Sequence, residues 1–208
     1  MTDKNHWESV YNTKASTAVS WFATHLETSL KFIESTGFGK DARIIDVGGG
    51  AATLVDDLLL RGYKNITVAD LASSALDIAQ QRLGEQAQQV TWLAGDITKM
   101  TLPRGMYDIW HDRAVFHFLT EEADRREYIK QVCSAVRQGG YVILATFGLL
   151  GPDKCSGLPV AHYNSQQLHE LFGEPFKLVG QATDEHVTPT GKKQEFVYCC
   201  CIKQAECQ

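Results

Sequence analysis

The sequence predicts a single α/β domain with a mostly parallel seven-stranded sheet, an antiparallel last strand and helices on both faces. Three observations indicate this fold class. Short apolar runs alternate with segments of helical period, three consecutive glycines separate the first such run from a helix, and two final apolar runs flank a turn-rich stretch. The unbroken alternation argues against a second domain over residues 1–208. We expect an N-terminal helical cap over residues 1–39 and a sheet-based core over residues 40–203.

The charge and hydropathy of the sequence limit the kinds of binding partner to be expected. Lys and Arg number 20 and Asp and Glu number 25, which gives a net charge of −5. Because no basic stripe is visible either, this argues against nucleic-acid binding. No apolar run approaches the length of a membrane span, and the first residues lack the apolar stretch of a signal peptide. We therefore expect a cytoplasmic protein without a membrane partner, while the sequence selects no oligomeric state.

The six cysteines do not form a metal-binding pattern. No pair has the C-x-x-C spacing of structural zinc sites, and the adjacent Cys199, Cys200 and Cys201 would point to alternate faces of a strand. We expect no metal, and free, packed thiols in a reducing compartment.

The cap region carries aromatic residues at helical spacing. Trp7 and Tyr11 stand four residues apart and share one face of a helix, and a second amphipathic helix is expected over Thr28–Thr36. The rings either cover an edge of the sheet or form a mobile lid whose faces contact a bound cation. Only the second interpretation gives the cap a role in ligand binding.

The stretch from residue 42 to residue 54, ARIIDVGGGAATL, contains the first strand and the turn after it. Arg43–Val47 reads as a strand buried on both faces, Gly48-Gly49-Gly50 lets the backbone turn sharply against a ligand, and a helix is expected over Ala51–Arg61. Free N–H groups at the helix start favour an anionic or polar ligand group. A Walker loop is excluded because no Lys-Ser/Thr follows the glycines, and the dinucleotide G-x-G-x-x-G spacing fails at Thr53.

Each of the first three predicted strands carries an aspartate close to its carboxyl end. Asp46 precedes the glycines, Asp70 ends the strand Asn65–Asp70, and Asp96 lies in the strand Gln89–Ile97. Asp70 follows Asp46 by 24 residues, close to the spacing at which an acid meets ribose hydroxyls. A lone aspartate of this kind is often a helix cap. Three of them at one edge of a parallel sheet favour a nucleoside-binding crevice.

The remaining elements complete the alternation. We expect helices over Ser73–Leu83, Glu122–Val136 and Asn164 to near Gly173, and strands over Tyr107–His111, Tyr141–Phe147, Phe176–Thr183 and Glu195–Ile202. The composition of residues 186–193, between the last two strands, implies a turn and therefore an antiparallel hairpin.

Candidate catalytic and substrate-binding residues lie at and after the carboxyl end of the fourth predicted strand. His111 and His117 are candidate general bases, because histidine titrates near neutrality, and Arg113 is a candidate substrate-binding residue. In the alternative interpretation His117 is a packed core residue between two phenylalanines, and Arg113 pairs with Asp112.

A turn-rich loop over residues 148–163 follows the fifth strand. Long irregular loops at this edge of a sheet usually carry function. We expect this loop to shape the substrate pocket with Cys155, His162 and Tyr163. His186, in the turn of the final hairpin, either faces the same pocket or is solvated.

These residues resemble a known family, the class I S-adenosylmethionine-dependent methyltransferases, over residues 40–203. Asp46 to Gly50 resembles the family's loop motif, Asp70 its ribose-binding acid, Asp96-Ile97 its adenine-contacting pair and Tyr107-Asp108-Ile109 its fourth-strand motif. The opening His6-Trp7-Glu8-Ser9-Val10-Tyr11 is similar to the N-termini of bacterial small methyltransferases and of elongation-factor lysine methyltransferases.

The resemblance implies a Rossmann-like fold, S-adenosyl-L-methionine as cofactor with S-adenosyl-L-homocysteine as product, and a small-molecule or protein methyl acceptor, the small molecule being favoured. It implies that the cofactor is bound by residues of the cap, the loop and the strand ends: Trp7, Tyr11, Asp46, Gly48, Gly49, Gly50, Asp70, Leu71, Asp96, Ile97 and His111. Ala52 departs from the family by replacing a third glycine, which the loop tolerates if φ stays negative there. A nicotinamide-dependent oxidoreductase and a non-catalytic nucleoside-binding module remain as alternatives.

Overall fold

The computed structural model describes residues 4–207 and contains a seven-stranded sheet of order β3-β2-β1-β4-β5-β9-β8. The strands are β1 Arg43–Val47, β2 Asn65–Asp70, β3 Val90–Ala94, β4 Tyr107–Arg113, β5 Val136–Phe147, β8 Phe176–Val187 and β9 Lys193–Lys203. The pairs from β3 to β5 are parallel, and β9 runs antiparallel to both of its neighbours. The predicted fold class is therefore confirmed.

Six α-helices accompany the sheet within residues 4–207: α1 Lys4–Thr13, α2 Glu27–Ser35, α3 Leu54–Leu60, α4 Ser73–Leu83, α5 Glu122–Ala135 and α6 Ser165–Phe172. Short 3-10 turns occur at Ser16–Ala18, Gly84–Gln89 and Phe116–Phe118. The predicted helix Ser73–Leu83 matches α4 residue for residue. Asn164 begins α6 with a capping box, because its side chain accepts from the Gln167 N–H and the Gln167 side chain accepts from the Asn164 N–H.

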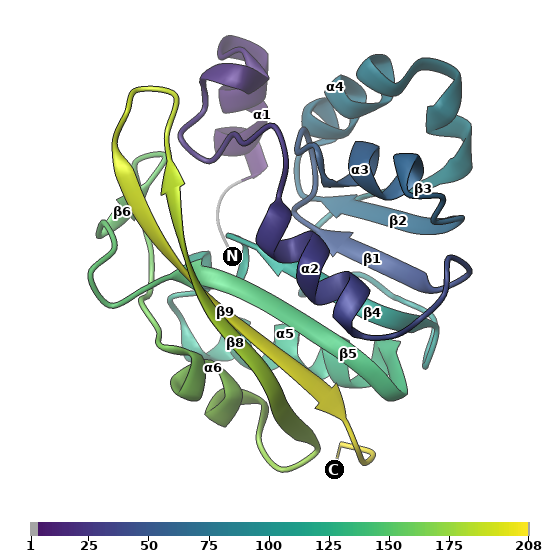
Figure 1. Ribbon diagram of the computed structural model, residues 1–208. Coiled ribbons are helices and arrows are strands. Elements are labelled where there is room, and N and C mark those ends of the chain that lie inside the picture. The colour runs from purple at the N-terminus through teal and green to yellow at the C-terminus, as the bar shows by residue number, and fades with distance from the viewer. Residues whose placement is uncertain (1–3, 208) are drawn as a thin grey trace.

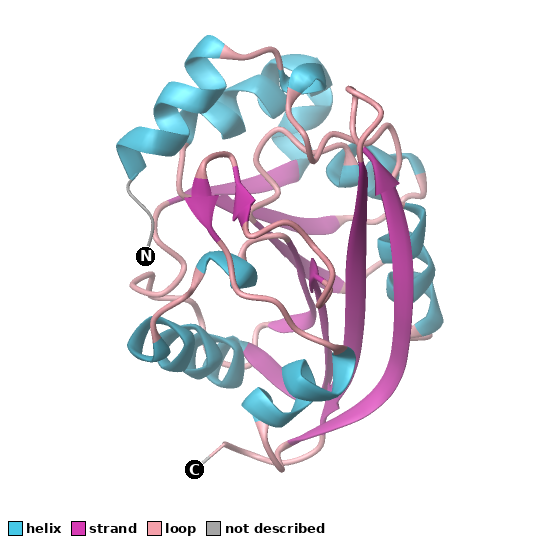
Figure 2. Ribbon diagram, turned by 90° about the vertical axis from the view of Figure 1, so that its left-hand side faces the viewer, coloured by secondary structure: helices cyan, strands magenta, loops and turns pink. Residues whose placement is uncertain are grey.

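The sheet separates two apolar layers. Alternate residues of each strand point to opposite faces, so Ile44 packs with Leu30 of α2 and Leu58 of α3, while Ile45 on the other face belongs to the cluster with Tyr128 of α5 and Phe172 of α6. Figure 1 shows α2 on one side of the strands and α5 on the other, and Figure 2 shows helices flanking the twisted sheet. Helices thus cover both faces, as the sequence predicts.

Strand order places the switch point of the sheet between β1 and β4. The chain proceeds from β1 outward to β3 and then returns to β4 on the other side of β1, which leaves a crevice beyond the carboxyl ends of these strands. Register puts Asp46 of β1 directly beside His111 of β4. Asp46 and His111, from segments far apart in sequence, are therefore neighbours in the sheet.

Several elements differ in their bounds from the prediction. Helix α3 begins at Leu54 rather than Ala51, because the loop first closes a turn with a hydrogen bond from the Ala52 N–H to the Gly49 carbonyl at 2.7 Å. Strand β5 begins at Val136. The loop expected to be irregular contains a small antiparallel hairpin, β6 Lys154–Cys155 with β7 Leu158–Pro159.

Strand β8 continues to Val187 and therefore includes His186, which the sequence placed in a turn. The hairpin β8–β9, green to yellow in Figure 1, reaches the segment after α1, where His186 Nε2 donates to the Ser20 carbonyl at 2.7 Å. His186 is buried, so the expectation that it is solvated is wrong.

The expectation of free thiols is wrong for two of the six cysteines. Cys133 near the end of α5 and Cys207 form a disulfide, with their Cα atoms 5.9 Å apart. The last residue of β9 also lies against the end of α5, where the Lys203 ammonium group donates to the carbonyl oxygens of Cys133 and Val136 at 2.6 and 3.0 Å. Cys155, Cys199, Cys200 and Cys201 are free and buried.

Among residues 4–207, no helix combines the length and the apolar character that crossing a membrane requires.

Candidate cofactor and substrate site

A large pocket lies at the carboxyl ends of β1, β2 and β4 and has a volume of about 720 Å³ including its open part. This is within the usual range for small-molecule sites. Its lining combines strand ends, the glycine loop and aromatic rings: Trp7, Tyr11, Trp21, Val47, Gly48, Ala69, Asp70, Leu71, Gly95, Ile97, Arg113, Ala114, Val115, Phe118, Leu119 and Cys155.

The glycine loop is shaped by the absence of side chains. Gly48 has φ of +70°, and its N–H donates to the Ala69 carbonyl at 2.7 Å, which ties the loop to β2. A Cβ atom on Gly49 would overlap the Asp46 carboxylate, and one on Gly50 would overlap the Asp70 carboxylate. Ala52 is absent from the described non-glycine residues with positive φ, so the condition for its tolerance is met.

Asp70 ends β2 inside the pocket. One of its carboxylate oxygens accepts from the Ala72 N–H at 2.9 Å. Burial raises the pKa of Asp70 to about 7, and the nearby carboxylates Asp46 and Glu8 act in the same direction. A buried acid with capacity left to accept from hydroxyl groups suits a ribose, and the apolar Leu71 and Ile97 beside it suit a flat ring.

Asp96 lies differently from the prediction. Its carboxylate accepts from the N–H and the hydroxyl of Thr98 at 2.9 and 2.6 Å and pairs with Lys99 at 3.3 Å. It does not line the large pocket, whereas its neighbours Gly95 and Ile97 do. The structure thus uses Asp96 to shape the turn after β3.

Four aromatic rings, those of Trp7, Tyr11, Trp21 and Phe118, also line the pocket. The Trp7 ring lies 5.1 Å from Phe118, 5.7 Å from Trp21 and 6.4 Å from Tyr11, measured between centroids. Burial, reinforced by the Asp70 carboxylate, raises the pKa of Tyr11, so its hydroxyl stays protonated. Trp7 and Tyr11 therefore line the pocket, as the lid interpretation requires, and their ring faces offer a favourable environment for a cation.

Glu8 holds the aromatic helix over the pocket. Its carboxylate accepts from the N–H and hydroxyl of Ser73, both at 2.9 Å, and from the N–H of Ser74 at 3.2 Å, so it caps the N-terminus of α4 from another helix. These bonds lower the pKa of Glu8 to about 2. Sequence reasoning missed this residue, because the two partners are 65 residues apart.

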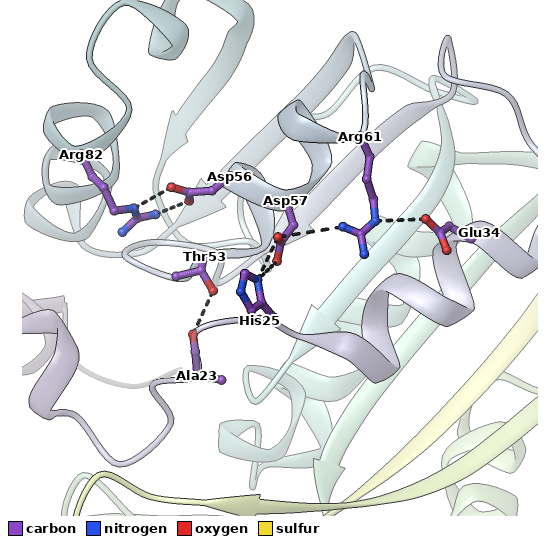
Figure 3. A network of polar contacts seen from close by, with 8 residues as sticks. All are labelled: Ala23, His25, Glu34, Thr53, Asp56, Asp57, Arg61 and Arg82. Atoms are coloured by element: carbon purple, nitrogen blue, oxygen red, sulfur yellow. Dashed lines mark hydrogen bonds and ion pairs between the residues drawn. The ribbon is translucent and has the colours of Figure 1, made fainter.

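A second anchor fixes the chain after α1. In Figure 3 the Thr53 hydroxyl donates to the Ala23 carbonyl at 2.9 Å, and His25 contacts the Asp57 carboxylate of α3 at 3.0 Å. Arg61, the residue directly after α3, pairs with Glu34 of α2 at 3.0 Å. The same view shows Arg82 of α4 paired with Asp56. The cap is thus joined to the core at both ends.

His111 is a connecting residue in a buried chain of hydrogen bonds. Its Nδ1 lies 2.7 Å from the Asp46 carboxylate and its Nε2 lies 2.9 Å from the Ser29 hydroxyl, which in turn lies 3.2 Å from the Tyr198 hydroxyl. Both ring nitrogens are therefore engaged. Asp46, predicted to orient the loop or to receive an ammonium group, is paired with His111 in this chain.

His117 is fully buried and does not line either of the two pockets described here. Its Nδ1 accepts from the Phe147 N–H at 3.4 Å, and its ring packs against Phe118 and Phe147 with centroids 4.6 and 4.7 Å away. Burial lowers its pKa to about 3, so it is neutral at physiological pH. The structure agrees with the interpretation of His117 as a packed core residue.

Of the residues predicted to bind substrate, Arg113 and Cys155 line the large pocket and His162 and Tyr163 do not. The His162 Nε2 donates to the Pro152 carbonyl at 3.1 Å within the loop. Tyr163 packs on Phe116, with centroids 5.8 Å apart. Burial raises the pKa of Cys155 to about 11, so this thiol is not a reactive thiolate.

A second pocket of about 520 Å³ adjoins the first across the glycine loop. The two share Tyr11, Trp21, Gly48 and Arg113, and the second also reaches the buried pair of Asp46 and His111. The site is therefore one crevice with two lobes, divided by the first glycine and by aromatic residues of the cap.

Comparison with known proteins agrees with this geometry. Residues 44–140 match a family model described as a methyltransferase domain. The EEF1A lysine methyltransferase 2 of Danio rerio is 20% identical over 190 residues, which cover 85% of this chain and 76% of that protein. These matches support a class I S-adenosylmethionine-dependent methyltransferase. The predicted cofactor, S-adenosyl-L-methionine, is thereby confirmed at the level of the family. The matches do not support the alternative of a nicotinamide-dependent oxidoreductase.

Solved structures share the fold of this methyltransferase. A S-adenosylmethionine-dependent methyltransferase of Anabaena variabilis superposes with a TM-score of 0.75 at 16% identity, covering 98% of this chain and 96% of that one. The 1,6-didemethyltoxoflavin-N1-methyltransferase of Burkholderia thailandensis, solved with its substrate and S-adenosylhomocysteine, gives 0.69 at 18% identity, covering 97% and 87%. The groups around Asp70 and the glycine loop fit the cofactor, because they pair hydroxyl acceptors and apolar walls with a side-chain-free backbone.

Proposed function

We propose that this methyltransferase transfers a methyl group to a small molecule bound in the crevice under α1. The observation that carries the proposal is the position of α1, whose Trp7 and Tyr11 form part of the wall of the large pocket while Glu8 is bonded to α4. A pocket covered on this side accommodates a small acceptor and limits its contact with water.

In this proposal the strand ends hold the cofactor. Asp70 accepts hydrogen bonds from the ribose hydroxyls, Leu71 and Ile97 pack on the adenine, and the Gly48 backbone lies against the chain of the cofactor. Trp7, Tyr11 and Trp21 surround the positively charged end, where aromatic faces stabilise a cation. The support for this assignment is that all these residues line one continuous cavity.

S-adenosyl-L-methionine supplies a methyl group on a positively charged sulfur, and the protein contributes alignment and exclusion of water. We propose that neither candidate histidine removes a proton from the acceptor. Both nitrogens of His111 are occupied, and His117 is buried beyond the pocket. The acceptor atom accordingly brings a free lone pair with it.

A protein lysine is the second candidate acceptor. It is favoured by the similarity to EEF1A lysine methyltransferase 2 over 85% of the chain. A lysine side chain would need α1 to move away from α4 before it could enter, since Trp7 and Tyr11 form part of the pocket wall. This is why we favour the small molecule.

Calorimetric titration with S-adenosylhomocysteine tests the cofactor site. Asp70→Asn keeps an acceptor for the Ala72 N–H but removes the charge, and it should weaken binding about tenfold or more, the size expected for hydrogen bonds to a charged group. Asp77→Asn, at an exposed position of α4, is the matched control and should bind like the wild type. Equal affinity of Asp70→Asn and wild type would contradict the assignment.

The acceptor is tested with a methyl-labelled donor. Small amines, thiols and carboxylic acids should be compared with an elongation-factor protein under the same conditions. Label recovered in a small molecule supports the proposal. Label recovered only in protein lysine would transfer support to the second candidate, and the absence of turnover with every acceptor would favour a non-catalytic module.

A further inference from the structure

We infer that Arg113 selects an acceptor that carries a carboxylate, so that the substrate of the proposed methyl transfer is a small organic anion. This inference rests on the proposed function and specifies the substrate class of the same crevice. The observation behind it is a cation in the pocket wall that forms no ion pair with a carboxylate of residues 4–207.

Arg113 occupies the junction of the two lobes. It is the last residue of β4, and its side chain lines both pockets. The next residue, Ala114, has φ of +76°, which turns the chain so that Val115 and Phe118 also reach the large pocket. A ligand that extends from the cofactor lobe toward the hairpin β6–β7 therefore passes this guanidinium, since Cys155 of β6 lines the same cavity.

The guanidinium is held by groups that leave its charge uncompensated. Its central carbon lies 3.9 Å from the centroid of the Phe196 ring, and one terminal nitrogen donates to the Trp21 carbonyl at a long 3.4 Å. The Nε atom is buried and has no hydrogen-bond partner. A buried N–H without a partner costs free energy, and a ligand that accepts from it recovers that cost.

No carboxylate of the described residues forms an ion pair with Arg113 within 4.0 Å. The acids around it have other partners, since Asp46 pairs with His111 and Asp112 accepts from Tyr128 and from the Val115 N–H. Asp184 faces the same side of the hairpin as its cross-strand partner Phe196, and it makes no ion pair with Arg113 either. The prediction that Arg113 pairs with Asp112 is thus not what the structure shows.

Among residues 4–207, Arg113 is the only lysine or arginine that lines the two lobes. Its planar fork matches a carboxylate, which can accept two parallel N–H bonds. An ammonium group such as that of lysine would instead meet a like charge in a partly desolvated site. The charge of Arg113 therefore favours a small carboxylate acceptor over a protein lysine.

Matched aromatic probes test the inference. Benzoate and benzamide have nearly the same shape and differ in charge, and Trp7 and Trp21 in the pocket wall give a fluorescence signal on binding. In the presence of saturating S-adenosylhomocysteine, wild-type protein should bind benzoate at least tenfold more tightly than benzamide. Benzylamine, the cationic probe, should bind more weakly than either.

Arg113→Gln should remove the preference for benzoate, and Arg113→Lys should retain part of it, because the charge remains while the planar fork is lost. Arg126→Gln, a substitution of an exposed arginine on α5, is the control and should keep the preference. Equal wild-type binding of benzoate and benzamide, no benzoate binding at millimolar concentration, or an undiminished preference in Arg113→Gln would each overturn the inference. If Arg113→Gln does not fold, the wild-type probe ranking and Arg113→Lys decide.

A different measurement would contradict the proposed function. A wild-type protein that does not bind S-adenosylhomocysteine would contradict methyl transfer, whatever the ranking of the probes. A protein that binds S-adenosylhomocysteine and methylates a neutral or cationic small molecule would leave the proposed function standing and refute the role of Arg113.

Discussion

Removing the Glu8 carboxylate should open α1 and weaken cofactor binding. In Glu8→Ala the N–H groups of Ser73 and Ser74 lose their acceptor at the start of α4, and α1 loses its bond to the core on that side. Because Trp7 lies one residue before Glu8, release of this helix withdraws an aromatic wall from the pocket.

The lowered pKa of Glu8 sets the size of the expected loss of stability. Lowering the pKa of Glu8 from 4.5 to about 2 sets an upper limit of about 3 kcal/mol on the contribution of the charge. The side chain is still 23% exposed, which screens part of this, and side-chain caps of helix N-termini typically contribute about 1–2 kcal/mol. We therefore expect a loss of about 1–2 kcal/mol, or about 5- to 30-fold in affinity if all of it couples to binding.

The lowered pKa also determines how the contribution of Glu8 to stability changes with pH. Since the pKa is lowered in the folded protein, the contribution is fully present above pH 4.5 and is lost as the pH falls toward 2. Measurements near pH 7 should thus show the whole effect, and Glu8→Gln, which keeps an acceptor oxygen but no charge, should fall between wild type and Glu8→Ala.

Calorimetry with S-adenosylhomocysteine and hydrogen exchange of the α1 amides are the two assays. Glu8→Ala should bind more weakly and exchange its α1 amides faster, while Glu127→Gln, which removes an exposed carboxylate paired with Lys130 on α5, should change neither. Wild-type affinity together with wild-type exchange in Glu8→Ala would refute the reasoning that Glu8 holds the cap closed.

Two further predictions concern buried groups. His117 has a pKa lowered to about 3, so the free energy of unfolding should decrease as the pH falls below about 6.5, where the unfolded chain takes up the proton; His117→Gln should flatten this decrease in urea titrations at pH 4–7, and an unchanged slope would argue against it. For the Cys133–Cys207 bond, thiol titration of denatured, unreduced protein should find the four free cysteines Cys155, Cys199, Cys200 and Cys201. Reduction should lower the thermal midpoint, because the bond closes a long loop and such bonds contribute about 2–4 kcal/mol; Cys207→Ser should melt at the reduced value with or without reductant, and six free thiols would exclude the bond.

Local sequence patterns determined the framework of this protein. A strand, three glycines and a helix identified the first crossover, the spacing of Asp46 and Asp70 indicated a nucleoside site, and a turn between two apolar runs implied the antiparallel end of the sheet. Each depends on residues close in sequence or on the rule that parallel strands end at one edge. For the same reason the sequence placed Asp70, Leu71, Ile97 and Arg113 at one edge of the sheet, where all four line one crevice.

Only the tertiary structure decided the partners of these residues. Glu8 meets Ser73 across 65 residues, His111 meets Ser29 across 82, and Cys133 meets Cys207 across 74. No periodicity encodes such pairs, because they result from how helices settle on the sheet and from strand register. The same packing engaged both nitrogens of His111, buried His117 behind phenylalanines and kept His162 and Tyr163 out of the pocket, while it left Arg113 in the wall with its charge uncompensated. Sequence thus named the residues at the edge of the sheet, and three-dimensional packing decided which of them face a ligand.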